Sequence, residues 1–219
     1  MGKYNIETHN EQYWEQYYGK EMISEESSFC GFIKGKIDSS SFIVDVGCGS
    51  GRDTTSFYES GYKVIGMDKS QQAIQKNEAK GKKGNIKFMC TDISQKYNFK
   101  NILKSVKDEN SNVPITIYSR FFLHSITLEN QNNFLEVIAE TLCNNDLLCL
   151  EFRTIEDSEI SKVYNNHYRR YIDMDKLLLE LEEKYNFEIY YSFKGRNLSI
   201  FKGENPYLGR IICGRKEDV

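Results

Sequence analysis

Short apolar runs alternate with helical patterns along most of the chain. The runs are rich in Ile, Val, Leu and Phe, which is typical of buried strands. Regular alternation of strand and helix patterns indicates βαβ units around a mostly parallel sheet, so we expect an α/β fold with helices on both faces. The expected strands are 41–46, 62–67, 86–90, 115–118, 147–152, 187–193 and 210–213.

Two helices between and after these runs are especially clear. In the segment 127–142, Phe134 and Ile138 fall on one face, and Thr127 can cap the amino end. The segment 173–185 begins with an Asp that can cap a helix in the same way. Two further helices are expected before the first strand, around 11–19 and 25–36.

The last two expected strands are joined by a short connection containing "KGENPY". A short connection favours an antiparallel pair, so we expect a seven-stranded, mostly parallel sheet with a C-terminal antiparallel hairpin at one end. The chain has 219 residues, with 15 Tyr and 13 Phe available for a core. This size suits one compact domain, so residues 1–219 are expected to form a single domain.

Composition argues against several classes of partner. The 29 basic and 32 acidic residues leave a net charge of −3, so no surface for nucleic acid is expected. No apolar run approaches the length that spans a bilayer, and the N-terminus lacks the apolar part of a signal peptide, so no membrane partner is expected. Six cysteines without zinc-type spacing are interpreted as reduced core thiols, with no metal site. We therefore expect a cytoplasmic monomer or homodimer.

The segment "FIVDVGCGSGRDTT" begins as a buried strand and breaks into Gly47, Gly49 and Gly51. Asp45 stands two residues before the first of these glycines. A strand that turns into a helix through such a loop places backbone N–H groups and a positive helix terminus beside a ligand. The dinucleotide-binding pattern G-x-G-x-x-G would need a glycine where this chain has Arg52, so the spacing here is a different one.

An acid follows each of the next two expected strands. Asp68 ends the segment "YKVIGMD", about 20 residues after the glycines, where a carboxylate can accept hydrogen bonds from both hydroxyls of a ribose. Asp92 lies in "FMCTDI" after the third strand. Each motif alone also occurs without a ligand, because Gly-rich turns are common and an Asp after a strand often caps a helix. Three motifs in order are far more specific.

Together the three motifs resemble those of class I S-adenosylmethionine-dependent methyltransferases. The resemblance implies a Rossmann-like fold, S-adenosylmethionine as cofactor and S-adenosylhomocysteine as product. It implies that the acid before the glycines holds the loop or meets the cofactor's ammonium group, that the second acid binds the ribose and that the third accepts from the adenine amino group. The cofactor-binding residues implied in this way are Asp45, Gly47, Gly49, Gly51, Asp68, Asp92, Ile93 and Ser119.

The segment "IYSRFFLHSI" after the fourth strand occupies the place where this family faces both the cofactor's methionine part and the substrate. It is not an N-P-P-Y signature, so methylation of DNA bases is not expected. His124 is a candidate general base, because transfer to a hydroxyl requires removal of its proton and an imidazole titrates near neutrality. In the alternatives, His124 packs under the following helix, or it only orients a phosphate or carboxylate that needs no base.

The region after the fifth strand, "EFRTIEDSEISKVYNNHYRRYID", is usually where this family recognises substrate, and we expect 153–172 to be a substrate-recognition insertion. Guanidinium groups suit phosphate or carboxylate oxygens, so the cations here predict a small anionic substrate. The alternative is a solvated charge run paired with nearby acids. The expected substrate-binding residues are Glu151, Arg153, His167, Arg169 and Arg170.

The N-terminal segment 1–40 is expected to form a helical lid. Trp14, Tyr17 and Tyr18 could close over the cofactor, or they could form the aromatic face of an amphipathic helix that packs on the domain.

Nearly the whole chain resembles bacterial small-molecule methyltransferases of surface-polysaccharide (capsule) biosynthesis. This resemblance implies O-methylation of a small anionic acceptor, such as a phosphorylated or nucleotide-linked sugar or a capsule phosphoramidate precursor. The alternatives are a methyltransferase for another small molecule, an NAD-binding oxidoreductase and a non-catalytic cofactor-binding module.

Overall fold

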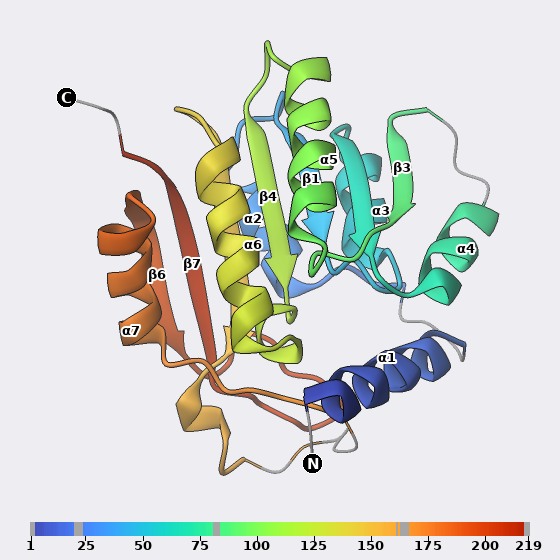
Figure 1. Cartoon of the computed structure of the whole chain (residues 1–219), viewed down its shortest axis with the longest axis vertical. Coiled ribbons are helices and arrows are strands. Elements are labelled where there is room, and N and C mark those ends of the chain that lie inside the picture. Colours follow the sequence, from blue (N-terminus) through green and yellow to red (C-terminus); the bar gives the residue numbers. More distant parts are fainter. Residues whose placement is uncertain (1–2, 20–23, 81–83, 161, 163–166, 217–219) are drawn as a thin grey trace.

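In the computed structural model, which describes residues 3–19, 24–80, 84–160, 162 and 167–216, one sheet runs through the molecule (Figure 1). It has seven strands in the order β3-β2-β1-β4-β5-β7-β6. The strands are β1 (Phe42–Val46), β2 (Lys63–Asp68), β3 (Ile86–Cys90), β4 (Ile115–Arg120), β5 (Leu147–Arg153), β6 (Phe187–Gly195) and β7 (Leu208–Arg215).

The pairing of these strands confirms the mixed sheet expected from the sequence. Strands β1 to β5 pair in parallel, whereas β7 runs antiparallel to both β5 and β6. The C-terminal hairpin therefore closes one end of the sheet, with β7 inserted next to β5. Because parallel strands end at the same edge, the segments that follow β1 to β5 are gathered there.

Three of the four expected helices begin and end within three residues of the expected positions, whereas the one expected around 11–19 begins earlier, at Lys3. Thr127 and Asp173 cap their helices, accepting hydrogen bonds from the N–H groups of Asn130 and Lys176. The second of these helices ends in a π-helical turn, Glu180–Lys184, which the helical pattern of the sequence does not indicate. The helices are α1 (Lys3–Gly19), α2 (Ser28–Lys34), α3 (Arg52–Glu59), α4 (Gln71–Ala79), α5 (Lys96–Glu109), α6 (Leu128–Thr141) and α7 (Met174–Leu179).

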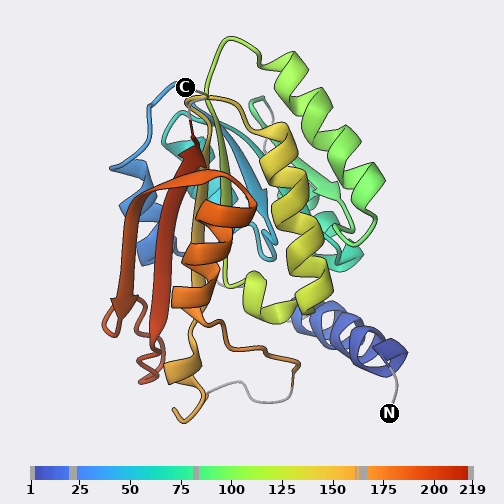
Figure 2. The ribbon, with the colours of Figure 1, turned by 60° about the vertical axis from the view of Figure 1, so that its left-hand side comes forward.

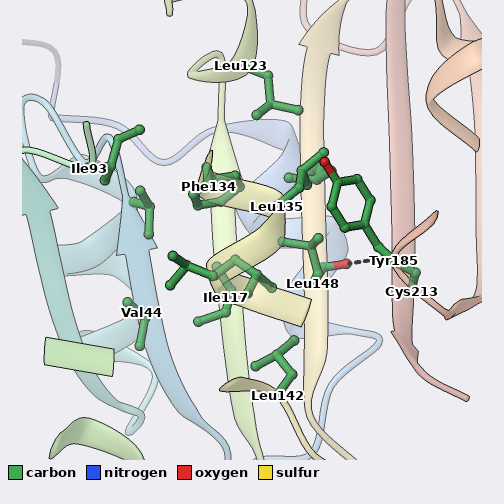
Figure 3. Close-up of a cluster of buried hydrophobic side chains, with 14 of the residues drawn as sticks. Val44, Ile93, Ile117, Leu123, Phe134, Leu135, Leu142, Leu148, Tyr185 and Cys213 are labelled. Atoms are coloured by element: carbon green, nitrogen blue, oxygen red, sulfur yellow. Dashed lines mark hydrogen bonds between the residues drawn. The ribbon is translucent and has the colours of Figure 1, made fainter. Parts of the chain in front are cut away.

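Helices cover both faces of the sheet (Figure 2), as the sequence predicts. Buried residues of α5, α6 and α7 form one apolar cluster with the strands, and α2 and α3 form a second cluster on the opposite face. Figure 3 shows the first cluster, in which Phe134 and Leu135 of α6 lie over Ile117 and Leu148. This double layer fixes the strand ends and the loops that leave them.

The first helix, α1, lies across the carboxyl ends of the parallel strands (Figure 1). None of the helices in the described part of the chain is both long enough and apolar enough to cross a bilayer. All six cysteines are free thiols, and four of them are buried. Cys90 and Cys143 are exposed, so the expectation of core positions was wrong for these two, which lie at the end of a strand and just after a helix.

Candidate active site

The glycine loop connects β1 to α3 and folds back on β2. The N–H groups of Gly47 and Cys48 donate to the carbonyl of Met67 at 2.8 and 3.0 Å. Gly49 has a φ of +48°, and a Cβ at this position would lie 2.2 Å from the hydroxyl of Tyr18. Only glycine combines this backbone conformation with so close a neighbour. The loop therefore passes directly beneath α1.

Asp45 is buried at the end of β1, and its Oδ2 accepts a hydrogen bond from the hydroxyl of Thr54 at 2.5 Å. Burial raises the pKa of this carboxyl to about 8, and the negative charges of Asp53 and Asp68 add to the effect, while the bond from Thr54 opposes it. Asp45 therefore holds the start of α3 and is largely protonated at neutral pH.

Asp68 joins the glycine loop to the start of α4. Its Oδ2 accepts from the N–H of Gly49 at 2.8 Å, and its Oδ1 accepts from the N–H of Ser70 at 2.9 Å. Burial raises the pKa of Asp68, against the effect of these two hydrogen bonds. A carboxylate has about four lone-pair positions, so Asp68 keeps acceptor capacity for the hydroxyls of a ribose.

The end of β3 carries a second group of polar side chains. Asp92 accepts from the hydroxyl of Ser94 and pairs with Lys69 at 2.8 Å. Burial raises the pKa of Asp92, but its bonds from Lys69 and Ser94 outweigh this and hold the pKa below its usual value. Beside it, the buried hydroxyl of Thr91 has no hydrogen-bond partner in the described part of the chain. A polar ligand would supply the missing partner.

These groups line one cavity of about 790 Å³ at the carboxyl ends of the strands. The cavity is acidic near β1, β2 and β3, where Asp45, Asp68 and Asp92 lie, together with Glu11 and Glu15 of α1. Near β4 and β5 it is lined by guanidinium groups, together with the carboxylates of Asp53 and Glu204. The cations on that side are Arg52, Arg120, Arg153 and Arg169.

Helix α1 covers this cavity and is attached on both sides. Its Glu15 Oε1 accepts from the N–H of Gln71 at the start of α4, at 2.7 Å. Its Asn10 amide donates to the carbonyl of Ser125 at 2.7 Å. The ring of Tyr13 stacks on His167 with centroids 4.8 Å apart. The aromatic side chains at positions 14, 17 and 18 also line the cavity, so the aromatic face of α1 is its roof.

His124 lies in a 3-10 turn after β4, with 4 % of its surface exposed. Its Nδ1 accepts a hydrogen bond from the N–H of Arg153 at 3.2 Å. Burial lowers the pKa of His124 well below its usual value, and the positive charges of Arg153 and Arg169 lower it further. His124 is therefore a neutral imidazole on the cavity wall. Phe121, with a φ of +56°, places its ring against this imidazole with centroids 5.4 Å apart.

Glu151 is held between two cations in neighbouring strands. Its side chain is fully buried, with Oε1 2.8 Å from Arg120 Nε and Oε2 2.7 Å from Arg210 Nε. The three residues are direct register partners across β4, β5 and β7. Glu151 thus lies outside the cavity lining, and it orients Arg120, which does line the cavity.

The other expected substrate-binding residues divide between the cavity and the interior. Arg153 lines the cavity and pairs with Asp157 at 2.6 Å and also with Glu204. Arg169 lines it as well, and its guanidinium donates to Nε2 of His167 at 3.0 Å. Burial lowers the pKa of His167 to about 4, assisted by the charges of Arg169 and Arg153.

Arg170 points away from the cavity lining. Its guanidinium donates to the carbonyls of Leu123 and Ile126 and to Gln131. Ser119 is also outside the lining, and its hydroxyl donates to the carbonyl of Val46 at 3.1 Å. Of the expected recognition insertion, residues 161 and 163–166 lie outside the described residues.

The cavity therefore collects most of the expected site residues and several unexpected ones. The expected site residues that lie outside its lining are Gly51, Ser119, Glu151 and Arg170. Arg52 was missed, although its position directly after the glycines could have suggested it. Its guanidinium lies 3.8 Å from Asp53, and burial together with the nearby charge of Arg120 lowers its pKa. The expected residues that line the cavity are Asp45, Gly47, Gly49, Asp68, Asp92, Ile93, His124, Arg153, His167 and Arg169.

S-adenosylmethionine fits the acidic end of this cavity. Asp68 has free acceptor capacity for a ribose, and the unpartnered hydroxyl of Thr91 and the carboxylate of Asp92 offer polar groups to a base such as adenine. In the described part of the chain, no group of three or more His, Cys, Asp or Glu residues is arranged to hold a metal ion.

Comparison with known proteins gives the same assignment. Residues 43–145 match a family described as a methyltransferase domain. A search of curated proteins found no match.

Among solved structures, an S-adenosylmethionine-dependent methyltransferase from Anabaena variabilis is 18 % identical with a TM-score of 0.70, and the match covers 97 % of this chain and 96 % of that one. The magnesium protoporphyrin IX methyltransferase of Synechocystis with bound S-adenosylmethionine is 13 % identical with a TM-score of 0.57, covering 96 % and 82 %. A glycopeptide N-methyltransferase with the same ligand is 10 % identical with a TM-score of 0.63, covering 90 % and 96 %.

The expected cofactor is thus confirmed by the family match and by neighbours solved with S-adenosylmethionine or S-adenosylhomocysteine. Residues 43–145 match the methyltransferase-domain family, and the chain has the Rossmann-like fold of the S-adenosylmethionine-dependent methyltransferases to which it is similar.

Proposed function

We propose that this protein transfers the methyl group of S-adenosylmethionine to an oxygen of a small anionic acceptor. The observation that carries the proposal is the division of charge within one cavity. Carboxylates lie beside β1, β2 and β3. The guanidinium groups of Arg120, Arg153 and Arg169 come from β4, β5 and the segment after β5, and Arg52 at the start of α3 is close enough to Arg120 for that charge to lower its pKa. An acceptor with a carboxylate or phosphate would complement the basic end, because planar guanidinium groups donate to both oxygens of such groups.

The proposed roles follow from position. Asp68 would hold the ribose, Asp92 and Thr91 the adenine, and Asp45 with the glycine loop the amino-acid part. When bound, the cofactor supplies an electrophilic methyl group on a positively charged sulfur. The protein's contribution would be alignment of the acceptor in the cavity that α1 covers, since orientation alone accounts for much of the rate of such transfers.

The fold alone leaves the methylated atom open, because structures of this fold include an N-methyltransferase. Oxygen is favoured here by the excess of donors and cations around the basic end, since an amine would place its own N–H groups against them. The acceptor classes that fit are phosphorylated sugars, nucleotide-linked sugars and phosphoramidates. These are the classes that the resemblance to capsule-biosynthesis methyltransferases implies.

The test is release of S-adenosylhomocysteine with a panel of these anionic compounds, each paired with its uncharged counterpart. Turnover restricted to the anionic members supports the proposal, and turnover with the neutral counterparts alone contradicts it. Binding of S-adenosylhomocysteine without turnover on any acceptor would favour the non-catalytic module, and binding of NAD in its place would favour the oxidoreductase.

Arg169 and Arg170 provide a matched pair of variants. Arg169 lines the cavity, and Arg170 donates to main-chain carbonyls outside it. Loss of a charged hydrogen bond costs about 1.5–3 kcal/mol, so Arg169→Gln should raise KM for the acceptor by about tenfold or more. Arg170→Gln should lower thermal stability with a smaller effect on KM. An equal rise in KM for both would show that Arg170 also reaches the substrate, as the sequence analysis expected.

A further inference from the structure

Two histidines on the basic side of the cavity have their ring protons fixed by their partners. The first is His124. A backbone N–H can only donate, so Nδ1 of His124, which receives the N–H of Arg153 at 3.2 Å, must carry a lone pair. In a neutral imidazole the proton then lies on Nε2. No hydrogen bond to Nε2 forms within the described part of the chain, so this N–H is available to a ligand in the cavity that His124 lines.

The second is His167, which is fixed in the opposite form. A guanidinium can only donate, so Nε2 of His167, 3.0 Å from Nη2 of Arg169, must carry the lone pair. The proton of His167 then lies on Nδ1. That nitrogen is buried and has no hydrogen-bond partner among the described residues. A buried donor without a partner costs about 1–3 kcal/mol, which a bound acceptor atom would recover.

We infer that the acceptor's reacting group is an oxyanion that is already ionised, a carboxylate or a phosphate-type oxygen, and that His124 serves as a neutral N–H donor to it and not as a base. This inference rests on the proposed function and names the substrate class of the same site. The two imidazole N–H groups and the guanidinium groups of Arg52, Arg120 and Arg169 are all donors. An oxyanion is the nucleophile that such a set binds, and it attacks without losing a proton.

The transfer then balances without acid or base. A lone pair of the acceptor oxygen forms the new O–C bond to the methyl group, while the S–C bond breaks and its electron pair stays on sulfur. The negative charge of the acceptor and the positive charge of the sulfonium disappear together. No proton moves, so no group of the protein needs to accept one.

A hydroxyl acceptor would require something different at His124. Its proton would have to move to a ring nitrogen, but Nε2 already carries a hydrogen and Nδ1 is occupied by the N–H of Arg153. Protonation at Nδ1 would place the new N–H of His124 against the backbone N–H of Arg153. The positive charges of Arg153 and Arg169 also oppose protonation of this ring. The arrangement therefore selects against acceptors that need deprotonation.

Nitrogen-15 NMR of the imidazole rings tests this directly, because the ring nitrogen shifts distinguish the two neutral tautomers and the cation. In the intact protein near neutral pH we expect His124 protonated on Nε2 and His167 on Nδ1, with assignments from His124→Gln and His167→Gln. A proton on Nδ1 of His124, or a cationic ring, would overturn the inference. This readout needs neither cofactor nor acceptor.

The second measurement adds simple probes to the S-adenosylhomocysteine complex: acetate, inorganic phosphate and methylammonium. A shift of the His124 Nε2 signal with acetate or phosphate supports the inference. The anion that causes the larger shift identifies the acceptor as a carboxylate or as a phosphate. A shift with methylammonium alone, or no shift with either anion, refutes it. Failure to bind S-adenosylhomocysteine would instead contradict the proposed function, while the tautomers could still be read.

Two substitutions separate the proposed donor, the Nε2 N–H of His124, from the contact that holds the ring, the hydrogen bond from the Arg153 N–H to Nδ1. His124→Asn retains an acceptor near Nδ1 for the Arg153 N–H but removes the donor at Nε2. His124→Gln places an amide near Nε2 but loses the contact with Arg153. We expect His124→Asn to weaken binding of the preferred anion by about tenfold, and His124→Gln to weaken it less. Equal weakening in both variants, with unchanged affinity for S-adenosylhomocysteine, would rule out the donor role.

Discussion

The buried carboxyl of Asp45 should make the stability of the protein fall as the pH rises. Its pKa is about 8 in the folded protein, compared with an ordinary value of 3.8. Between these values the folded state holds one more proton than the unfolded state. Stability therefore decreases with rising pH across this window, by at most about 1.4 kcal/mol per pH unit, and levels off above the folded pKa.

Asp45→Asn isolates this contribution. The amide has nearly the shape of the protonated acid, can accept the hydrogen bond from Thr54, and does not titrate. The free energy of unfolding of the variant minus that of the wild type should thus grow with pH. From about pH 5 to about pH 7.5 the growth should reach on the order of 3 kcal/mol.

Urea unfolding in the absence of cofactor, followed by circular dichroism at several pH values, measures this difference. Asp38→Asn is the control, because Asp38 is exposed and hydrogen bonds from Ser40 lower its pKa, so its titration is complete below this range. Its difference from the wild type should stay constant with pH. A constant difference for Asp45→Asn as well would refute the assignment of a protonated acid at the end of β1.

Two further predictions concern the loop and the buried ion pairs. Gly49→Ala should weaken binding of S-adenosylhomocysteine measured by calorimetry, because its Cβ would lie 2.2 Å from the hydroxyl and 2.7 Å from Cζ of Tyr18. Adding Tyr18→Ala, which removes the hydroxyl and the ring together, should restore part of the affinity, and no restoration would contradict this contact. Glu151→Gln should lower the free energy of unfolding by about 3–5 kcal/mol, since it leaves the guanidiniums of Arg120 and Arg210 buried without a counter-charge, and a loss below about 1 kcal/mol would argue against the network.

The part of the site that could be predicted from the sequence is the part fixed by strand order. Gly49, Asp68 and Asp92 lie at or just after the end of a parallel strand, so their meeting at one edge follows from the βαβ pattern. The expected strand 86–90 coincides with β3 because its apolar positions are a local signal.

The part that could not be predicted depends on register and on side-chain direction. Glu151 was expected to face the substrate with Arg153, but it lies opposite Arg120 and Arg210 in the neighbouring strands, and that pairing requires a register that no local pattern contains. Arg169 and Arg170 are adjacent and chemically identical, yet one lines the cavity and the other binds main-chain carbonyls. The tertiary path of the chain decides between them.

The opposed charges at the two ends of the cavity have a consequence for turnover. Before transfer, a sulfonium and an oxyanion would each be attracted into this field. Afterwards the sulfur is neutral and the acceptor carries one negative charge fewer, so this attraction is weaker for the products than for the substrates. An enzyme built in this way would release its products more readily than its substrates.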